Sequence, residues 1–356
     1  MDRVESDRSP AREGLSTRCS LLDMAAIQTF GLTKEYRSRL PRPRTPTAAR
    51  ALDDLTLDVR NGEVFGFLGP NGAGKTTMIR LLLGFLHPTS GQATVLGLDT
   101  ERRSVEIRQR VGYLPGGIAL YDGLSGERLL DYLAGLYGRP APRRRELLDR
   151  LEFSDRDLRR PVRDYSRGMR QKIGIVQALQ HDPELAILDE PSEGLDPLVQ
   201  RAFYAILDDL RGAGRTVFFS SHVLSEVERL CDRVAIIRRG QLVALEEVES
   251  LLARRKRNVE MRLAGPPPIL DGVPGVSGLT IADGLVTCQL EGDVGPFLQA
   301  IAGHSISDLT IEPAHLEEAF LEFYADELGL ADWGRSTRQV AETSREEATA
   351  PSVVDR

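Results

Sequence analysis

The sequence predicts an α/β domain with a largely parallel sheet, followed by a small α+β domain. Between residues 52 and 245, short β-rich runs alternate with amphipathic runs of helical length, which is typical of parallel strands joined by crossover helices. After the basic run at residues 254–257, proline-rich turn sequences and short strands replace that pattern. The 356 residues also suffice for about two domains.

The N-terminal part is predicted to begin with a disordered leader. Residues 1–23 are polar and have no hydrophobic period, so they offer little apolar surface to bury. Residues 25–36 are expected to form a first strand and turn. Residues 37–50 contain five arginines and three prolines and are predicted to be a loop, because proline removes backbone donors and like charges repel. A solvated insertion is the favoured interpretation, with contact to acidic lipid or a partner as the alternative.

Four continuous apolar runs are expected to form strands that are covered on both faces. They lie at residues 63–68, 185–188, 216–219 and 233–237. Helical patterns dominate between about residues 120 and 180. A helical subdomain is therefore expected to interrupt the sheet there.

A smaller domain is expected to follow the α/β domain, which we assign to residues 24–245. Residues 259–263 and 285–290 are predicted strands, and residues 314–328 are predicted to form an amphipathic helix. The apolar face of that helix carries Leu316, Ala319, Phe320 and Phe323. We assign residues 246–334 to this accessory domain and the polar residues 335–356 to a disordered tail.

The composition narrows the classes of function. The formal net charge is −7, which gives no whole-chain reason to expect binding to nucleic acid or to an anionic membrane surface. Cys19, Cys231 and Cys288 are odd in number and widely spaced, so they fit neither a disulfide framework nor a zinc site and favour a reducing compartment. No run approaches the roughly 18 apolar residues of a membrane-spanning helix, and the N-terminus does not resemble a secretion signal. The chain by itself is expected to stay in the cytoplasm.

A glycine-rich segment predicts a binding site for a nucleoside triphosphate. It consists of Gly69, Pro70, Asn71, Gly72, Ala73, Gly74, Lys75 and Thr76, with Thr77 next. A predicted strand precedes it and a predicted helix at residues 76–86 follows it, as the phosphate-loop pattern requires. The glycines let successive backbone N–H groups face the phosphates, and the helix N-terminus is electropositive. Lys75 is expected to reach the β- and γ-phosphates, and the Thr76 hydroxyl to ligate Mg²⁺.

Two carboxylates end the apolar run at residues 185–188. Asp189 is expected to hold Mg²⁺ through its water shell, as in other phosphoryl-transfer sites. Glu190 is expected to point the other way by strand alternation, where it can orient or deprotonate the attacking water. A simple helix cap is the alternative interpretation of the pair.

Together these residues resemble the ATP-binding subunits of ABC transporters, over about residues 25–245. In that family the position of Tyr36 stacks on adenine, which needs only a flat aromatic face; a core aromatic is the alternative for Tyr36. Ser166 and Gly168 stand at the family's signature, which closes over the γ-phosphate of the opposite subunit. Asp196 matches the loop that communicates between the two subunits in that family. His222 matches the family's switch histidine at the γ-phosphate, for which a structural histidine is the alternative.

Two departures from the family pattern stand out. The signature usually reads Leu-Ser-Gly-Gly-Gln, whereas here Arg167 replaces the first Gly and Met169 the Gln. After Pro115 the family normally has a Gln that touches Mg²⁺ and the attacking water, but this chain has Gly116 and Gly117. No side chain at these two glycines can ligate a metal.

The sequences of these motifs are similar to those of type-2 ABC exporters, a group that includes the daunorubicin-resistance-like pumps. Residues 309–320 also resemble the C-terminal end of such subunits. The resemblance implies a P-loop NTPase fold of the ABC type with a helical subdomain. It also implies an ATP hydrolase that powers drug, antibiotic or lipid efflux.

The same resemblance implies the partners. Each ATP would lie between two copies of the chain in a head-to-tail dimer. A separate transmembrane permease would dock near residues 119–160. The chain would then lie peripherally on the cytoplasmic face of the membrane. No nucleic-acid partner is expected. The alternatives are a soluble ABC ATPase that acts on nucleic acid or ribosomes, and a nucleotide-binding regulator with little hydrolysis.

Overall fold

The computed structural model describes residues 25–37, 48–253 and 256–312. The predicted leader at 1–23, the helix at 314–328 and the tail at 335–356 lie outside these residues. The chain divides into two compact units, Met1–Glu249 and Ser250–Arg356, and each is described by itself below. The sequence placed this boundary four residues earlier, at 245.

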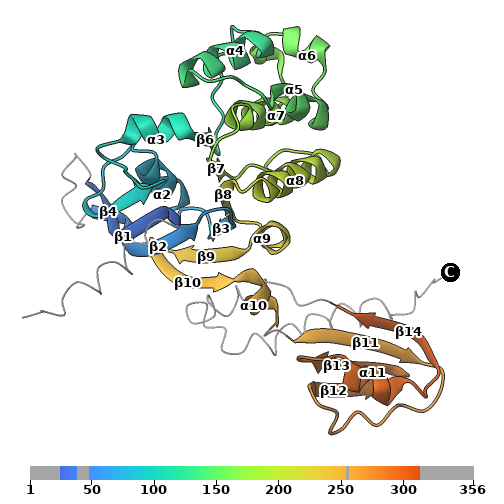
Figure 1. The fold of residues 1–356 in the computed structure, drawn as a ribbon. Coiled ribbons are helices and arrows are strands. Elements are labelled where there is room, and N and C mark those ends of the chain that lie inside the picture. Colours follow the sequence, from blue (N-terminus) through green and yellow to red (C-terminus); the bar gives the residue numbers. More distant parts are fainter. Residues whose placement is uncertain (1–24, 38–47, 254–255, 313–356) are drawn as a thin grey trace, which may run out of the picture. The chain divides into compact units, whose positions relative to one another are not determined.

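The first unit is built on a six-stranded sheet (Figure 1), with the strand order β10-β9-β3-β8-β7-β6. Its strands are β3 (Val64–Leu68), β6 (Val111–Leu114), β7 (Leu185–Asp189), β8 (Thr216–Ser221), β9 (Arg233–Arg238) and β10 (Gln241–Glu247). All neighbouring pairs are parallel except β9 and β10. The predicted largely parallel sheet is therefore confirmed, and the carboxyl ends of β3, β7 and β8 meet at one edge.

A second, antiparallel sheet in this unit was not predicted. It has the order β2-β1-β4-β5, formed by β1 (Ala25–Arg37), β2 (Ala48–Arg60), β4 (Ser90–Val95) and β5 (Leu98–Asp99). The loop predicted for residues 37–50 is wrong at both ends, because Arg37 belongs to β1 and residues 48–50 belong to β2. Ala48, Ala49 and Arg50 pair with the end of β1, and Arg50 also forms ion pairs with Glu35 and Asp53. The rest of the predicted loop lies outside the described residues.

A group of helices between β6 and β7 confirms the predicted helical subdomain. It comprises α4 (Gly126–Tyr137), α5 (Arg144–Arg150), α6 (Asp155–Arg159), the short η1 (Val162–Asp164) and α7 (Arg167–Leu179). Figure 1 shows α4 to α7 gathered in one group, in green, on one side of the unit. The other described helices of this unit are α2 (Lys75–Leu82), α3 (Ser104–Arg110), α8 (Pro197–Gly212) and α9 (Leu224–Leu230). Helix α10 (Val248–Ala253) spans the boundary between the two units in the chain.

Helix α2 ends at Leu82, four residues before the predicted end at 86. The backbone turns to the left-handed region at Gly84, with φ of +65°, and a Cβ there would lie 2.4 Å from the Ser104 Cβ. Apolar side chains of α2 pack with those of both sheets in one continuous core. This core fixes the segment between β3 and α2 from both sides.

The second unit is a four-stranded antiparallel sheet with one short helix. Its order is β12-β13-β11-β14, formed by β11 (Arg257–Leu263), β12 (Val276–Ala282), β13 (Leu285–Leu290) and β14 (Ile306–Ile311), with α11 at Gly295–Ile301. The strands predicted at 259–263 and 285–290 are confirmed, whereas β12, β14 and α11 were not predicted. Phe297 and Ile301 of α11 pack on Val259, Met261 and Val286.

The described residues also bear on membrane-spanning segments and on the cysteines. Among them, no helix is both long and apolar enough to cross a bilayer. Cys231 and Cys288 are free and buried, and burial raises the pKa of both thiols.

Candidate functional site

The glycine-rich segment between β3 and α2 has the geometry that only glycine permits. Gly72 and Gly74 have φ values of +83° and +112°, in the left-handed region. A Cβ on Gly74 would lie 2.4 Å from the Ala51 carbonyl, and one on Gly69 would lie 2.5 Å from the Ile237 carbonyl. The loop therefore packs against neighbouring backbone before it enters the N-terminus of α2, which is the arrangement that binds phosphate groups.

A cavity of about 510 Å³ opens over this loop. It is lined by Ala51, Pro70, Asn71, Gly72, Gly74, Lys75, Thr76, Thr77, Arg80, Tyr113, Pro115, Gly116, Gly117, Asp189 and Glu190. Most of the loop residues predicted from the sequence are in this set, together with both strand-end carboxylates. Gly69 and Ala73 belong to the loop but do not line the cavity, whereas Arg80 and Tyr113 line it and were not predicted.

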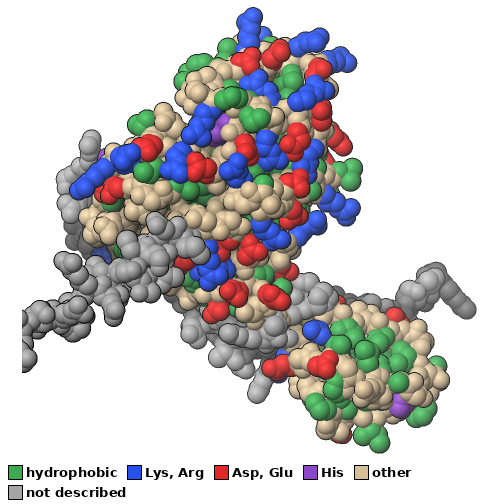
Figure 2. Space-filling view, viewed as in Figure 1, with side chains coloured by type: hydrophobic (Ala, Val, Ile, Leu, Met, Phe, Trp, Pro, Cys, Tyr) green, Lys and Arg blue, Asp and Glu red, His purple; other side chains and the backbone are tan. Residues whose placement is uncertain are grey.

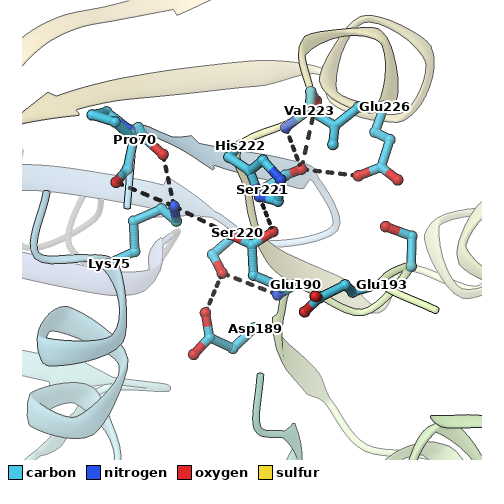
Figure 3. Close-up of polar contacts among 12 residues, drawn as sticks. Pro70, Lys75, Asp189, Glu190, Glu193, Ser220, Ser221, His222, Val223 and Glu226 are labelled. Carbon is cyan, nitrogen blue, oxygen red and sulfur yellow. Dashed lines mark hydrogen bonds and ion pairs between the residues drawn. The ribbon is translucent and has the colours of Figure 1, made fainter. Parts of the chain in front are cut away.

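Lys75 contacts both the glycine-rich loop and Glu190 (Figure 3). Its Nζ donates to the Gly69 carbonyl over 2.6 Å and lies 3.1 Å from Glu190 Oε1. The lysine side chain is only 7% exposed, so water screens its positive charge weakly and its interactions with anionic groups are stronger than in bulk solvent. Lys75 is thus held by groups that an incoming phosphate can replace.

Asp189 and Thr76 place two oxygen atoms that could ligate a metal ion close together in the cavity. The Thr76 hydroxyl donates to Asp189 Oδ2 over 2.9 Å, and the Ser220 hydroxyl donates to Oδ1 over 2.5 Å. No group of three or more His, Cys, Asp or Glu side chains that could cage a metal occurs among the described residues. One carboxylate and one hydroxyl beside a phosphate site nevertheless fit Mg²⁺, which takes few protein ligands and keeps its waters and phosphate oxygens.

Glu190 reaches its position by a backbone turn and not by strand alternation, as the sequence had suggested. The strand β7 ends at Asp189, and Glu190 adopts a left-handed φ of +51°. This turn carries its carboxylate to Lys75 on one side and to Nδ1 of His222 on the other, at 2.6 Å. A non-glycine residue in this region is strained, and such strain is common at functional sites.

The segment that carries His222 is held by a network that sequence reasoning missed. The Ser221 hydroxyl accepts the Val223 N–H and donates to Glu226 Oε2, and Tyr204 donates to Glu226 Oε1 over 3.0 Å. Figure 3 shows Glu226 on the far side of this turn from Lys75. The available sequence signal was Glu226, which lies in the helix that follows His222.

Tyr36 stands at the end of β1 and is 40% exposed. Its hydroxyl lies 3.5 Å from Oγ1 of Thr77, and Lys34 lies over its ring. The alternative of a core aromatic does not fit this exposure. An exposed ring beside the phosphate loop offers a stacking face for a base.

The signature residues lie together, away from the cavity of their own chain. The Ser166 hydroxyl caps α7 by accepting the Met169 N–H over 3.2 Å. A Cβ on Gly168 would lie 3.2 Å from the Gly194 carbonyl, and Arg167 pairs with Glu193. None of Ser166, Gly168 and Asp196 lines the cavity over the phosphate loop.

Asp196 caps α8 by accepting the N–H groups of Val199 and Leu198. These two backbone hydrogen bonds, that of Val199 first, hold the pKa of the Asp196 carboxyl below its usual value. The cap gives Asp196 a structural role in its own chain in addition to any role toward a second one.

The two glycines that replace the family's Gln line the cavity beside Asp189. A Cβ on Gly116 would lie 3.3 Å from Asp189 Oδ2, whereas one on Gly117 would meet nothing within 4 Å. Tyr113 stands near them, and burial together with the charge of Asp189 raises its pKa to about 12. The phenol therefore stays neutral at physiological pH.

The phosphate loop after β3, the carboxylates that end β7 and the parallel sheet together define a P-loop NTPase. A family model described as "ABC transporter" matches residues 52–193. The chain is 44% identical over 233 residues to an uncharacterised ABC transporter ATP-binding protein of Nostoc sp., covering 64% of this chain and 68% of that protein. The chain belongs to the ABC transporter ATP-binding proteins, and the predicted resemblance is confirmed.

Other relatives carry names of exporters or transporters of antibiotics. The fluoroquinolones export ATP-binding protein of Mycobacterium tuberculosis is 34% identical over 304 residues, which cover 83% of this chain and 92% of that protein. The bacitracin transport ATP-binding protein of Bacillus licheniformis is 36% identical over 239 residues, covering 67% and 75%. A solved structure of an ATP-binding subunit of an ABC transporter superposes with a TM-score of 0.57 at 30% identity, covering 64% of this chain and 91% of that one. The fold predicted from the sequence and the assignment as an ATP-binding subunit are both confirmed.

Proposed function

We propose that the chain hydrolyses ATP to power a separate membrane-spanning permease of an exporter for drugs, antibiotics or lipids. The observation that carries the hydrolytic part is the position of Glu190, in contact with both Lys75 and His222. The exporter part is supported by relatives named for fluoroquinolone export and bacitracin transport.

The phosphates of ATP would enter the cavity over the loop and take Lys75 away from Glu190. An ammonium group has three donors, and those of Lys75 now serve the Gly69 and Pro70 carbonyls and Glu190. A γ-phosphate carries more negative charge than one carboxylate. Lys75 would therefore bind the phosphate and release Glu190. Tyr36 would stack on the adenine, and Thr76 and Asp189 would hold Mg²⁺, which neutralises phosphate charge.

Hydrolysis would then follow from the freed carboxylate. Glu190 accepts a proton from the attacking water as the water oxygen bonds to the γ-phosphorus, and the bond to the bridging oxygen breaks to give ADP and phosphate. Lys75 stabilises the charge on the phosphate oxygens. His222 holds Glu190 in place and presents its second ring nitrogen to the γ-phosphate.

Two chains would form the complete site as a head-to-tail dimer. Ser166, Gly168 and Asp196 do not line the cavity of their own chain, which is consistent with service to a second copy. The hydroxyl of Ser166 accepts one hydrogen bond from its own helix and keeps its proton available for a γ-phosphate oxygen across the interface. ATP would close the dimer and loss of the γ-phosphate would open it.

The permease would contact the helical subdomain, at about residues 119–160, with the chain bound peripherally at the cytoplasmic face of the membrane. Tyr121, Tyr132 and Leu136 are exposed there, and the two tyrosine rings contact each other edge to face with centroids 5.4 Å apart. Figure 2 shows basic and acidic side chains interspersed over this unit. That mixture supports a protein partner over a nucleic acid, which calls for a continuous basic surface.

Co-purification from native cells tests the exporter part. The tagged full-length chain is isolated in a gentle detergent, and the E190Q variant with ATP is isolated in parallel to enrich the closed complex. We expect a stoichiometric membrane protein with several spanning segments to co-purify. Recovery of the chain with ribosomes or DNA in the soluble fraction would contradict the proposal.

A further inference from the structure

The hydroxyl groups of two neighbouring serines at the end of β8 form hydrogen bonds on opposite sides of the candidate site. Ser220 and Ser221 are fully buried, at 0% and 1% exposure. The Ser220 hydroxyl donates to Asp189, whereas the Ser221 hydroxyl donates to Glu226. Figure 3 shows these two directions, with Ser220 toward Asp189 and Glu190 and Ser221 toward Val223 and Glu226.

Ser220 holds both members of the carboxylate pair. In the parallel pairing of β7 with β8, Ser220 lies opposite Asp189, so its side chain reaches the carboxylate directly. Its backbone carbonyl accepts the Glu190 N–H over 3.1 Å, and its hydroxyl oxygen lies 3.3 Å from the same nitrogen. A serine hydroxyl can donate one hydrogen bond and accept another, and this one does both.

The contact matters because Asp189 is a buried carboxylate, 2% exposed. In the described part of the chain it makes no ion pair; hydroxyl groups bind its two oxygens, Thr76 at Oδ2 and Ser220 at Oδ1. Without the Ser220 hydroxyl, Oδ1 would lose its partner and the carboxylate could rotate toward another donor. The oxygen that faces Thr76 would then no longer be fixed.

We propose that Ser220 is a positioning residue for the metal-nucleotide site: it fixes the Asp189 carboxylate so that Oδ2 faces Thr76, and it anchors the left-handed turn that directs Glu190. This inference rests on the proposed function. Hydrogen-bond partners of metal-binding side chains commonly change metal affinity by about 10–100-fold when they are removed. Ser220 therefore contributes to Mg²⁺ affinity without touching the nucleotide.

The test compares two residues of nearly the same shape. Ser220→Thr keeps the hydroxyl, and Ser220→Val replaces it by a methyl group, so both variants add similar bulk at the buried position. Ser220→Ala removes the hydroxyl without added bulk. Thr216→Val removes a buried hydroxyl at the other end of β8, where it accepts the Gly62 N–H. Thermal unfolding of each full-length variant reports folding separately from binding.

The readout is the binding of Mn²⁺, measured by electron paramagnetic resonance in the presence of a non-hydrolysable ATP analogue. We expect Ser220→Ala and Ser220→Val to weaken Mn²⁺ binding about tenfold, while Ser220→Thr and Thr216→Val stay within about twofold of the parent chain. Binding of the analogue in EDTA should be the same in all of them. If Ser220→Ala does not fold, the Thr and Val pair decides.

Two outcomes would overturn the inference. Equal Mn²⁺ affinity of the Thr and Val variants would mean that Ser220 only fills space. A loss in Thr216→Val as large as that in Ser220→Ala would mean that the effect is a general disturbance of β8. Failure of the parent chain to bind the Mn²⁺–nucleotide complex would instead refute the proposed function, which separates the two failures.

Discussion

Glu190 Oε2 lies 2.6 Å from Nδ1 of His222, although the two residues are 32 positions apart in the sequence. They follow the ends of β7 and β8, which are neighbouring parallel strands. The glutamate side chain is 16% exposed and the histidine 48%. When Nδ1–H donates to the carboxylate, Nε2 becomes the free acceptor or donor of the ring.

Glu190→Gln should abolish steady ATP hydrolysis while ATP still binds. The amide keeps the shape of the side chain but cannot accept a proton from water, so the loss should be about 10²–10⁴-fold in kcat. Because the γ-phosphate then persists, the variant should accumulate as an ATP-bound dimer, which size-exclusion chromatography with and without ATP detects. Hydrolysis at the normal rate in this variant would exclude Glu190 as the base.

His222→Ala should lower kcat by about 10²-fold with little change in ATP affinity. The substitution removes the group that fixes one oxygen of Glu190, but it leaves Lys75 and the phosphate loop in place. His87 is an exposed histidine that pairs with Glu101 at the surface, so His87→Ala is the matched control and should hydrolyse ATP like the parent chain. An equal effect of the two substitutions would argue against a role for the Glu190–His222 contact.

The sequence predicted those parts of the site that depend on local patterns. The phosphate loop is a contiguous motif between a strand and a helix, and Asp189 directly follows a buried apolar run. Since the carboxyl ends of parallel strands meet at one edge, the convergence of Lys75, Thr76 and Asp189 follows from those two patterns. The cavity brings them together.

The parts that the sequence did not predict depend on pairing between distant segments. Ser220 meets Asp189 through the register of β7 with β8, and the burial of Glu226 depends on Tyr204 from another helix. The left-handed turn at Glu190 breaks the strand alternation that was used to place its side chain. Ala48 and Ala49 are strand residues because β1 provides a partner, which overrides the arginine and proline signals nearby.

The two roles of Ser166 can be separated by substitution. Ser166→Ala removes the cap of α7, at a cost of about 1 kcal/mol in the free energy of unfolding, and also removes the hydroxyl proposed to meet the partner's γ-phosphate. Ser166→Asp keeps a capping oxygen but places a negative charge where that phosphate would arrive. We expect the Asp variant to unfold like the parent chain and to lose ATP-driven dimerisation, as measured by light scattering in the Glu190→Gln background. Normal dimerisation of Ser166→Asp would contradict the head-to-tail arrangement.

His181 should make stability depend on pH in a defined window. Its ring is 4% exposed and stacks on Tyr137 with centroids 3.9 Å apart. Burial, with a smaller contribution from the charge of Arg139, lowers its pKa from 6.5 to about 4. Between these two values the unfolded chain binds a proton that the folded chain excludes, so the free energy of unfolding falls as the pH falls from about 6.5 to about 4. The total loss is about 3 kcal/mol, because each pH unit between the two pKa values contributes about 1.4 kcal/mol.

His181→Phe retains an aromatic ring against Tyr137 and cannot titrate. The difference in Tm between the variant and the parent chain should therefore move in favour of the variant between pH 7.5 and pH 4.5. A constant difference in Tm across that range would mean that the pKa of His181 is the same in the folded and unfolded states.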